Sequence, residues 1–244
     1  MIFSRVFSFA AMLIFAAFVA TVAQAQSVDR TALEGEIRAL LGELKATEQQ
    51  FLEPSAKDNR KNAAFLTQPD TGLIRLLPRQ ASDNNLTIRG GGAYYSFFRL
   101  THEYGFGSDI TLEQGQFGVG FAGADFGFLT RLGKVEIADV TLNHPAAQFL
   151  ANFTAPALEA DAREQYRRAG AGFDMNGFTY NARVPVKAKN AYLLRSVTYG
   201  RSDLLVGLRV VSQDFDGSVV IVWKILKRFP VPEFQDIETS RNWR

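Results

Sequence analysis

The sequence predicts an α+β fold: a single domain with a mainly antiparallel β-sheet, an N-terminal helix and one further helix packed on it. The first observation is the run 190–230, which reads as three strands joined by two short turns. The second is that strand-like segments outnumber helical ones without regular alternation, which disfavours a doubly wound parallel sheet. The third is a helical apolar stripe within 27–53, followed later by an amphipathic segment at 157–168.

The segment 27–53 is expected to form the N-terminal helix. Its apolar positions recur at alternating spacings of four and three residues, which places them on one stripe. They are Leu33, Ile37, Leu40, Leu44, Thr47 and Phe51. Asp29 or Ser27 can cap the start of this helix, and Pro54 ends it. A stripe this short favours a helix packed on a sheet over an oligomerising coiled coil.

The next part of the chain is predicted to be less regular. Residues 55–69 are polar and basic, and they form either a linker or a short exposed helix. Between 93 and 133 the chain holds ten Phe or Tyr residues and many glycines. Glycine inside a strand marks a bulge or a close approach of the backbone. We therefore expect short, strongly bent strands in this region that cover part of the main sheet, near 94–99, 110–113, 116–122 and 126–129.

Three further elements are expected before the central strands. Residues 135–140 fit one more strand, and His144-Pro145 opens a short apolar helix that runs to about residue 153. Residues 178–189 alternate between apolar and polar side chains. Pro185 and the lysines of this segment suit an edge strand, where a missing N–H is harmless and charge discourages further pairing.

The two turns of the central meander set the predicted register of its strands, 192–199, 204–212 and 219–229. Asp216-Gly217 is favoured where a two-residue turn needs positive φ. If these two residues are the turn, Arg209 lies directly opposite Lys224. A three-residue break at 200–202 then places Arg195 diagonally from Arg209 on the same face.

Three cations, Arg195, Arg209 and Lys224, are thus predicted on the sheet face opposite the apolar face of Leu204 and Trp223. Like charges directly opposite one another in a sheet are destabilising, so acidic groups are expected among them. Three interpretations stay open, and one of them is that the register assumed here is in error and the cluster does not form. In the other two, internal carboxylates pair with these cations, or the cations form a binding site for an anionic ligand.

The start of the chain predicts export. Residues 1–25 combine Arg5, an apolar run and the ending Ala23-Gln24-Ala25, which is the pattern of a secretory signal peptide cleaved before Gln26. The alternative is a retained N-terminal membrane anchor. No other segment reaches the roughly 18 apolar residues of a membrane-spanning helix. The expected product is a periplasmic or extracellular domain at 26–233 with a polar tail at 234–244.

Composition limits the function classes. The sequence has no cysteine, which excludes thiol catalysis and cysteine-ligated metals. Removal of 1–25 takes away Arg5 and no acidic residue, so the formal charge falls from +2 to +1. This balance gives no indication of nucleic-acid binding. We expect no cofactor and no bound metal, and the chain is expected to be a monomer or a small homo-oligomer.

Two motif matches have better structural explanations. Residues 118–123 fit G-x-G-x-x-G, but a strand-like segment follows where a dinucleotide site needs a helix. Asp214-Phe-Asp-Gly-Ser resembles the start of a calcium loop. The twelfth position from Asp214 is Ile225, inside a strand, where an EF-hand needs a bidentate Glu. We interpret the first motif as sheet bends and the second as a hairpin turn.

The one cluster of acid–base residue types is His102 with Asp109 and Glu113. A hydrolase would use His102 as the base, with Asp109 or Glu113 orienting it. The structural alternative is a histidine at a strand end that makes a hydrogen bond to the backbone. No G-x-S-x-G or H-E-x-x-H motif accompanies the cluster. The favoured prediction is therefore a non-enzymatic binding protein for an unknown protein or anionic ligand, and the alternative is a hydrolase.

Overall fold

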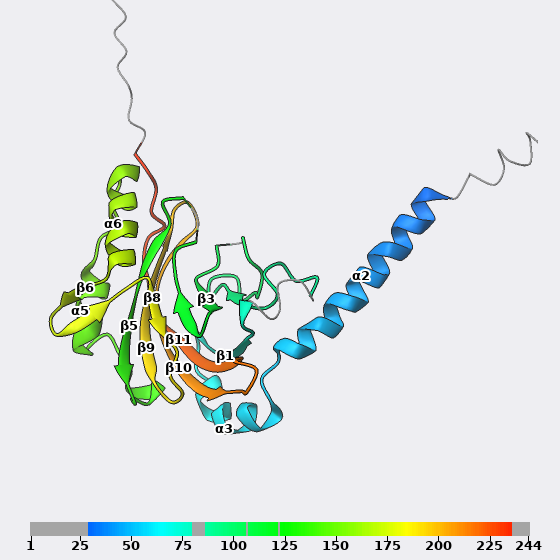
Figure 1. The fold of residues 1–244 in the computed structure, drawn as a ribbon, viewed down its shortest axis with the longest axis horizontal. Helices are drawn as coiled ribbons and strands as arrows, with labels where there is room; N and C mark the ends of the chain where they lie inside the picture. The colour runs from blue at the N-terminus through cyan, green and yellow to red at the C-terminus, as the bar shows by residue number, and fades with distance from the viewer. Residues whose placement is uncertain (1–28, 80–85, 106, 122, 236–244) are drawn as a thin grey trace, which may run out of the picture. The chain divides into compact units, whose positions relative to one another are not determined.

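The computed structural model describes residues 29–79, 86–105, 107–121 and 123–235, and Figure 1 shows its ribbon. The predicted signal peptide at 1–25 and its cleavage site lie outside the described residues, and so does 236–244 of the predicted tail. The chain divides into two compact units, 1–47 and 48–244, and each is described by itself.

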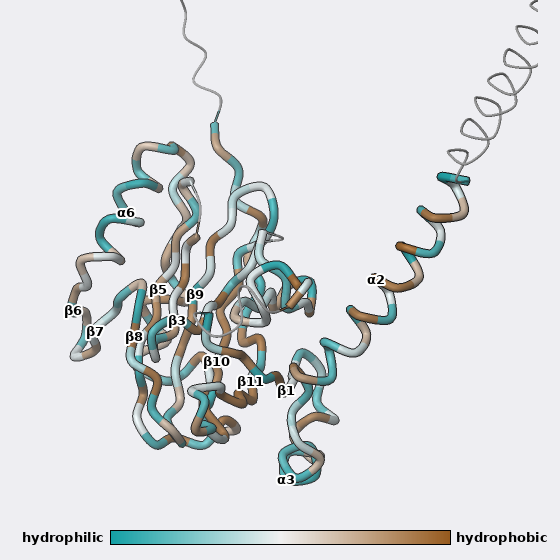
Figure 2. The backbone as a smooth tube through the Cα atoms, turned by 45° about the vertical axis from the view of Figure 1, so that its right-hand side comes forward, coloured by the Kyte–Doolittle hydropathy of each residue, from teal (hydrophilic) through white to brown (hydrophobic). Residues whose placement is uncertain are grey.

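The predicted N-terminal helix is present as α2 (Arg30–Leu52). The Asp29 carboxylate caps it, because its Oδ1 accepts hydrogen bonds from the backbone N–H groups of Thr31 (3.0 Å) and Ala32 (3.2 Å). Apolar and polar positions alternate along the helix in Figure 2. The packing of its stripe on the sheet stays a prediction, since most of the stripe and the sheet belong to different units.

The fold is α+β with a mainly antiparallel sheet, as predicted. The main sheet has the strand order β1-β11-β10-β9-β5, and every neighbouring pair is antiparallel. Its strands are β1 (Thr71–Leu76), β5 (Phe126–Gly133), β9 (Ala191–Thr198), β10 (Ser202–Gln213) and β11 (Val219–Arg228). The meander β9-β10-β11 forms its centre, which confirms the three strands predicted from the hairpin pattern.

The predicted register of the last hairpin is wrong by two residues. Arg209 lies opposite Val222, and Lys224 lies opposite Gly207. The final pair before the turn is Gln213 with Val219, so the turn is longer than two residues. A further shift lies between Val210 and Ser212. A bulge sets two residues against one, so counting outward from a turn cannot reveal it.

A second, smaller sheet covers one face of the main sheet. Its strand order is β2-β3-β4-β8. The strands are β2 (Tyr94–Tyr95), β3 (Ile110–Glu113), β4 (Gln116–Gly118) and β8 (Arg183–Pro185). Of these, β2, β3 and β4 match short strands expected in the aromatic, glycine-rich region, whereas the segment expected at 126–129 belongs to β5 and thus to the main sheet itself. Apolar residues of both sheets form one core cluster, in which Phe97 and Phe117 pack with Leu208 and Trp223.

The strand predicted at 178–189 is divided into two. Its first part, β7 (Phe178–Tyr180), pairs with β6 (Phe173–Met175) in a two-stranded ribbon, and its second part is β8. The division falls at Asn181 and Ala182, where the Ala182 N–H donates to the Ala169 carbonyl at 2.7 Å. Strand alternation continues across this break, which explains the single strand predicted. Pro185 does lie on an edge strand.

Helices cover the other face of the main sheet, as Figure 1 shows for α6. They are α5 (Pro145–Asn152) and α6 (Glu159–Ala171), near the predicted positions. Leu150 of α5 and Ala162 of α6 pack with Leu205 and Val222 of the sheet. Another helix, α3 (Ala56–Leu66), has Ser55 as its N-cap residue. The Ser55 hydroxyl oxygen accepts a hydrogen bond from the Asp58 N–H.

The prediction of a strand at 135–140 is wrong. This segment contains a 3₁₀ turn, η1 (Ile137–Asp139). Backbone hydrogen bonds from Asp139 to Glu136 and from Val140 to Ile137 close it locally. Apolar residues at 135, 137 and 140 match a strand only in part, and Ile137 and Val140 instead pack on the helical face of the main sheet.

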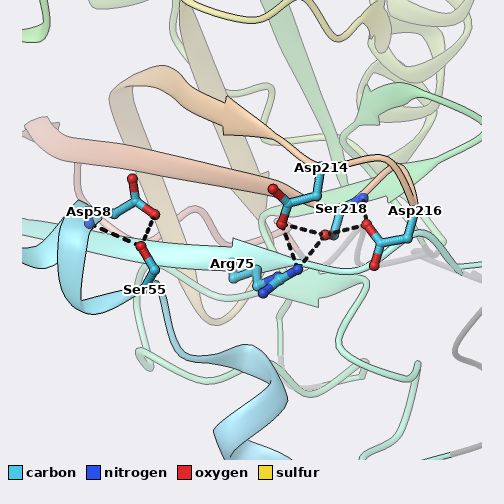
Figure 3. A network of polar contacts seen from close by, with 6 residues as sticks. All are labelled: Ser55, Asp58, Arg75, Asp214, Asp216 and Ser218. Carbon is cyan, nitrogen blue, oxygen red and sulfur yellow. Dashed lines mark hydrogen bonds and ion pairs between the residues drawn. The ribbon is translucent and has the colours of Figure 1, made fainter.

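The Asp214–Ser218 turn is tied to β1 by a polar network (Figure 3). Arg75 Nη2 donates to Asp214 Oδ2 at 2.6 Å and to Ser218 Oγ at 2.9 Å. The Ser218 hydroxyl donates to Asp216 Oδ1 at 2.7 Å. A guanidinium thus lies among the side-chain oxygens of this motif, which confirms its interpretation as a structural hairpin turn.

Candidate functional site

The structure places the three predicted cations on one face of the main sheet, and it gives each a partner. Arg195 is 1% exposed, and its guanidinium forms a bidentate ion pair with Asp203 through Nε–Oδ1 and Nη2–Oδ2, the latter at 2.7 Å. It also donates to the backbone carbonyls of Leu150 and Phe153. A guanidinium held in this way has no free donor directed at solvent.

The other two cations contact the segment around η1. Arg209 Nη2 lies 2.7 Å from Glu136 Oε1, and Lys224 Nζ donates to the Ala138 carbonyl at 3.0 Å. Burial lowers the pKa of Lys224, and Asp139 acts in the opposite direction.

The predicted diagonal neighbourhood of Arg195 and Arg209 is wrong, because the strands are joined at 199–201 and not at 200–202. Arg195 lies opposite Leu205, four residues along β10 from Arg209, so about 13 Å separates the two arginines along the strands. Arg195, Arg209 and Lys224 therefore form a row in which each cation is paired with a carboxylate or a backbone carbonyl, and we call these three residues the cationic row.

His102 is used structurally. Its Nε2 lies 3.0 Å from the Arg75 carbonyl oxygen, and its ring packs edge-on against Tyr95 at 4.8 Å between centroids. Burial lowers the pKa of His102 to about 4, and the hydrogen bond to Arg75 opposes this shift only in part. The imidazole is therefore neutral at pH 7, held between a carbonyl and an aromatic ring.

Asp109 is fully buried, whereas His102 is only partly buried, and the two side chains have different contacts. Its Oδ2 accepts a hydrogen bond from the Phe97 N–H at 2.7 Å, and Ser96 Oγ lies 3.4 Å away. Burial raises its pKa to about 6, although neighbouring hydroxyl and backbone N–H groups, Ser196 first among them, lower it. Asp109 thus closes the loop between residues 96 and 109.

Glu113 pairs with two arginines, Arg79 (2.9 Å) and Arg183 (3.2 Å). Among the described residues, no hydrogen bond or ion pair joins any two of His102, Asp109 and Glu113. The acid–base constellation that a hydrolase would need is not assembled in this geometry.

One cavity of about 270 Å³ lies beside the end of β9. Its polar groups include Asp125, which accepts a hydrogen bond from the Tyr199 N–H at 3.1 Å, and Arg201, which donates to the Gly105 carbonyl. Burial raises the pKa of Asp125, while the Tyr199 N–H and Arg201 lower it. Both charged groups are thus engaged by neighbouring backbone.

A larger, open groove of about 540 Å³ lies between the edge strand β5 and the strands β7 and β8. Three exposed cations line it, namely Arg131 from β5, Arg183 from β8 and Lys187 just after β8. Thr130, Thr179 and the residues around Asn181 supply further polar groups. We call this site the cationic groove.

Acidic residues neutralise the cationic groove only in part. Arg183 shares the single carboxylate of Glu113 with Arg79. Asp174 accepts a hydrogen bond from the Thr179 hydroxyl at 2.6 Å. Neither Arg131 nor Lys187 forms an ion pair with any residue that the structure describes. The groove therefore presents a net positive field to solvent, and anions are the ligands that such a field attracts.

The topology explains why the sequence does not predict the cationic groove. Arg131 and Arg183 are 52 positions apart in the chain, and they meet because Leu129 of β5 bridges to Asn181. The alternation of Arg183, Pro185 and Lys187 in the predicted edge strand does indicate one charged face. Nothing in the sequence indicates which strand lies opposite it.

Comparison of this chain with protein-family models, with curated proteins and with solved structures gives no match. No helix in the described part of the chain is long and apolar enough to cross a membrane. Across 29–79, 86–105, 107–121 and 123–235, no three His, Asp or Glu side chains gather as metal ligands would.

Proposed function

We propose that the protein is an exported, non-enzymatic module that binds an anionic ligand or partner in the cationic groove. The observation that carries this proposal is the pair of exposed cations, Arg131 and Lys187, which line a groove without an acidic partner among the described residues. Arg183 adds a third positive charge, and it shares its acidic partner with Arg79. Guanidinium groups suit phosphate, sulfate and carboxylate because they donate two parallel hydrogen bonds.

The cationic row is the competing surface for the same ligand chemistry. Its accessible members are Arg209 and Lys224, whereas Arg195 is enclosed. An anion that bound there would have to displace Glu136 from Arg209 and the Ala138 carbonyl from Lys224. The cationic groove requires no such exchange, and we therefore favour it.

We expect polyvalent anions to stabilise the mature chain, 26–244, against thermal unfolding. A ligand that binds only the folded state at about 100 times its dissociation constant adds about 2.7 kcal/mol to the free energy of unfolding. Phosphate, sulfate and heparin are the probes, each measured at constant ionic strength by differential scanning fluorimetry. The largest shift is expected for heparin, since it presents several anionic groups to the groove at once.

Two matched double variants locate the site. Arg131→Gln with Lys187→Gln should remove the shift, whereas Arg209→Gln with Lys224→Gln should retain it. Both pairs remove two positive charges, so a general loss of charge affects them equally. If the Arg209 and Lys224 variant loses the anion-induced shift and the Arg131 and Lys187 variant keeps it, the anion binds at the cationic row. If both variants keep the full shift, the anion binds at neither place.

Export is the second part of the proposal, and it rests on the pattern of residues 1–25. We expect the protein recovered from the periplasmic or extracellular fraction of a bacterial host to begin at Gln26. Mass spectrometry of the intact protein measures this directly. Replacing two residues of the apolar run, Ile14→Lys and Phe15→Lys, should leave the precursor uncleaved in the cytoplasm. A mature protein that still begins at Met1 would contradict the assignment.

No specific observation favours the hydrolase alternative, because His102, Asp109 and Glu113 have separate partners. We propose no catalytic role for them.

A further inference from the structure

The cavity beside the end of β9 has the size of a site for a small molecule. Its volume of about 270 Å³ corresponds to about nine water molecules, at roughly 30 Å³ for each in the liquid. Pockets that enclose drug-sized ligands begin at about 300 Å³. All of its lining residues lie within the unit 48–244. The cavity therefore suits a molecule about as small as a single amino acid or a monosaccharide.

The wall of this cavity contains buried hydroxyl groups. Thr198 is 5% exposed, and its side chain forms no hydrogen bond within the part of the chain that the structure describes. Ser196 lies two residues earlier on the same side of β9, is 2% exposed and lines the same cavity. A hydroxyl that is removed from bulk water without a hydrogen bond costs free energy. A polar ligand in the cavity would satisfy such a hydroxyl.

Two opposite charges line the same cavity and do not pair with each other. Asp125 lies just before β5, and Arg201 lies in the turn between β9 and β10. Arg201 lowers the pKa of Asp125, so the two charges interact, but no ion pair joins them within the described residues. They are also the only charged residues among those described that line the cavity. The site is therefore neutral overall, with its positive and negative ends separate.

Each of these charged groups keeps positions for further hydrogen bonds. Asp125 accepts from the Tyr199 N–H through Oδ1 alone, and Arg201 donates to the Gly105 carbonyl through Nη1 alone, at 3.4 Å. Asp125 Oδ2 and the Nε and Nη2 groups of Arg201 have no partner among the described residues. Burial raises the pKa of Asp125 despite the Tyr199 N–H and Arg201, so its negative charge is only partly compensated. A cation beside Oδ2 would complete this compensation.

This arrangement selects a ligand that carries both charges. An ammonium group pairs with a carboxylate such as Asp125, and a carboxylate fits the parallel N–H donors of a guanidinium. A simple anion would pair with Arg201 but would face Asp125, and a simple cation would have the converse problem. Tyr104, Phe121 and Phe126 supply the apolar part of the wall. A third charge on the ligand would therefore lack a partner among the described residues.

We infer that this cavity binds a free amino acid as its zwitterion, with the ammonium group at Asp125 and the carboxylate at Arg201. The side chain of this amino acid is uncharged and lies against the aromatic wall. The cavity and the cationic groove share no lining residue, so amino-acid binding here is independent of anion binding in the groove.

Isothermal titration calorimetry of the mature protein with glycine, serine, leucine and phenylalanine at pH 7 tests this assignment. At least one of the four should bind. Its N-acetyl form lacks the ammonium group and its amide lacks the carboxylate, so each should bind at least about tenfold more weakly, as expected when a hydrogen-bonded charge loses its partner. No binding of any of the four, or equal binding of the blocked forms and the free amino acid, would overturn the inference.

Glucose is the uncharged probe of similar size. Its hydroxyl groups can bind Ser196 and Thr198, but it carries neither charge. We expect no binding of glucose in the same titration. Binding of glucose in place of the amino acids would assign the cavity to an uncharged polyol, and the zwitterion assignment would then be wrong.

Variants that remove one charge each locate the binding. Asp125→Asn and Arg201→Gln should each weaken amino-acid binding at least about tenfold. Asn keeps an oxygen that can accept from the Tyr199 N–H, and Arg201 is exposed, so both variants should retain the wild-type thermal midpoint. Asp139→Asn and Arg163→Gln remove the same charges from residues that do not line the cavity, and both should bind as the wild type does. Unchanged affinity in Asp125→Asn and Arg201→Gln would contradict the site.

The blocked amino acids show which end of the ligand each residue contacts. In Asp125→Asn, acetylation of the ammonium group should cost less affinity than in the wild type, because the partner of that group is already absent. In Arg201→Gln, the same should hold for the amide. Equal costs in all three proteins would contradict both contacts. Failure of the anion-binding experiment alone would leave these expectations unchanged.

Discussion

Replacing Arg195 by Met should lower the free energy of unfolding by about 3–5 kcal/mol, the cost of leaving one member of a buried ion pair alone. Arg195 and Asp203 are 1% and 3% exposed, and Met keeps much of the aliphatic volume of Arg. Asp203 would lose the guanidinium that pairs with both of its oxygens, and the carbonyls of Leu150 and Phe153 would lose a donor. Burial already raises the pKa of Asp203, against the opposing effect of Arg195.

Urea unfolding of the mature chain at pH 7 measures this loss. The matched control is Arg163→Met, which removes an arginine that pairs with Glu159 on the exposed face of α6. Both members of that pair are more than half exposed, so the control should lose less than about 1 kcal/mol. A loss of similar size in the two variants would contradict the structural role of Arg195.

The double variant Arg195→Met with Asp203→Leu separates the ion pair from packing. A buried ion pair replaced by apolar residues of similar volume is often neutral in stability, because the cost of desolvating both charges disappears. The double variant should therefore be more stable than Arg195→Met alone. If it is less stable than Arg195→Met, Asp203 stabilises the fold through contacts other than its ion pair with Arg195.

The main sheet was predictable because its signals are local. Alternating apolar residues and short turns in 190–230 identify three neighbouring strands, and only residues close in sequence are needed to read them. The register of β10 against β11 could not be predicted from the sequence in the same way. A register shift lies between Val210 and Ser212, and a long turn follows Gln213, where Asp214 contacts Arg75. Arg75 lies on β1, far from this turn in the sequence.

The charged sites depend even more on contacts between distant segments. The sequence predicts acidic groups near the cationic row, and Asp203 and Glu136 occupy that role. Neither could be chosen in advance, because Glu136 reaches Arg209 only through the 3₁₀ turn that takes the place of a predicted strand. The cationic groove likewise needs β5 and β8 to approach one another. By contrast, the apolar stripe of α2 is fully visible in the sequence.

His102 and Asp109 together should make the stability of the wild-type protein depend only weakly on pH between about 6 and 4, because their pKa values are shifted in opposite directions. The pKa of His102 falls from its ordinary 6.5 to about 4 in the folded chain. Below pH 6.5 the unfolded chain binds the extra proton, so acidification destabilises the fold. The pKa of Asp109 rises from 3.8 to about 6, so in this case the folded chain binds the proton first and acidification stabilises it.

Each shift corresponds to about 3 kcal/mol across its full window, at about 1.36 kcal/mol per pKa unit. His102→Gln removes one side of this balance and retains an amide that can donate to the Arg75 carbonyl. Relative to the wild type, the variant should therefore gain about 2–3 kcal/mol as the pH falls from about 6.5 to about 4.5. Urea unfolding at half-unit steps of pH gives both curves, and groups other than His102 cancel in their difference.

Asp109→Asn is the matched counterpart, and its profile should have the opposite slope. This variant retains a side chain of the same shape but loses the group that binds a proton near pH 6, so acidification should destabilise it relative to the wild type. Any constant offset from weaker hydrogen bonds to the Phe97 N–H would not change with pH. Parallel profiles for the wild type and both variants would contradict the burial that we assign to His102 and Asp109. Opposite slopes would confirm that the two side chains titrate as separate groups and do not act as an acid–base pair.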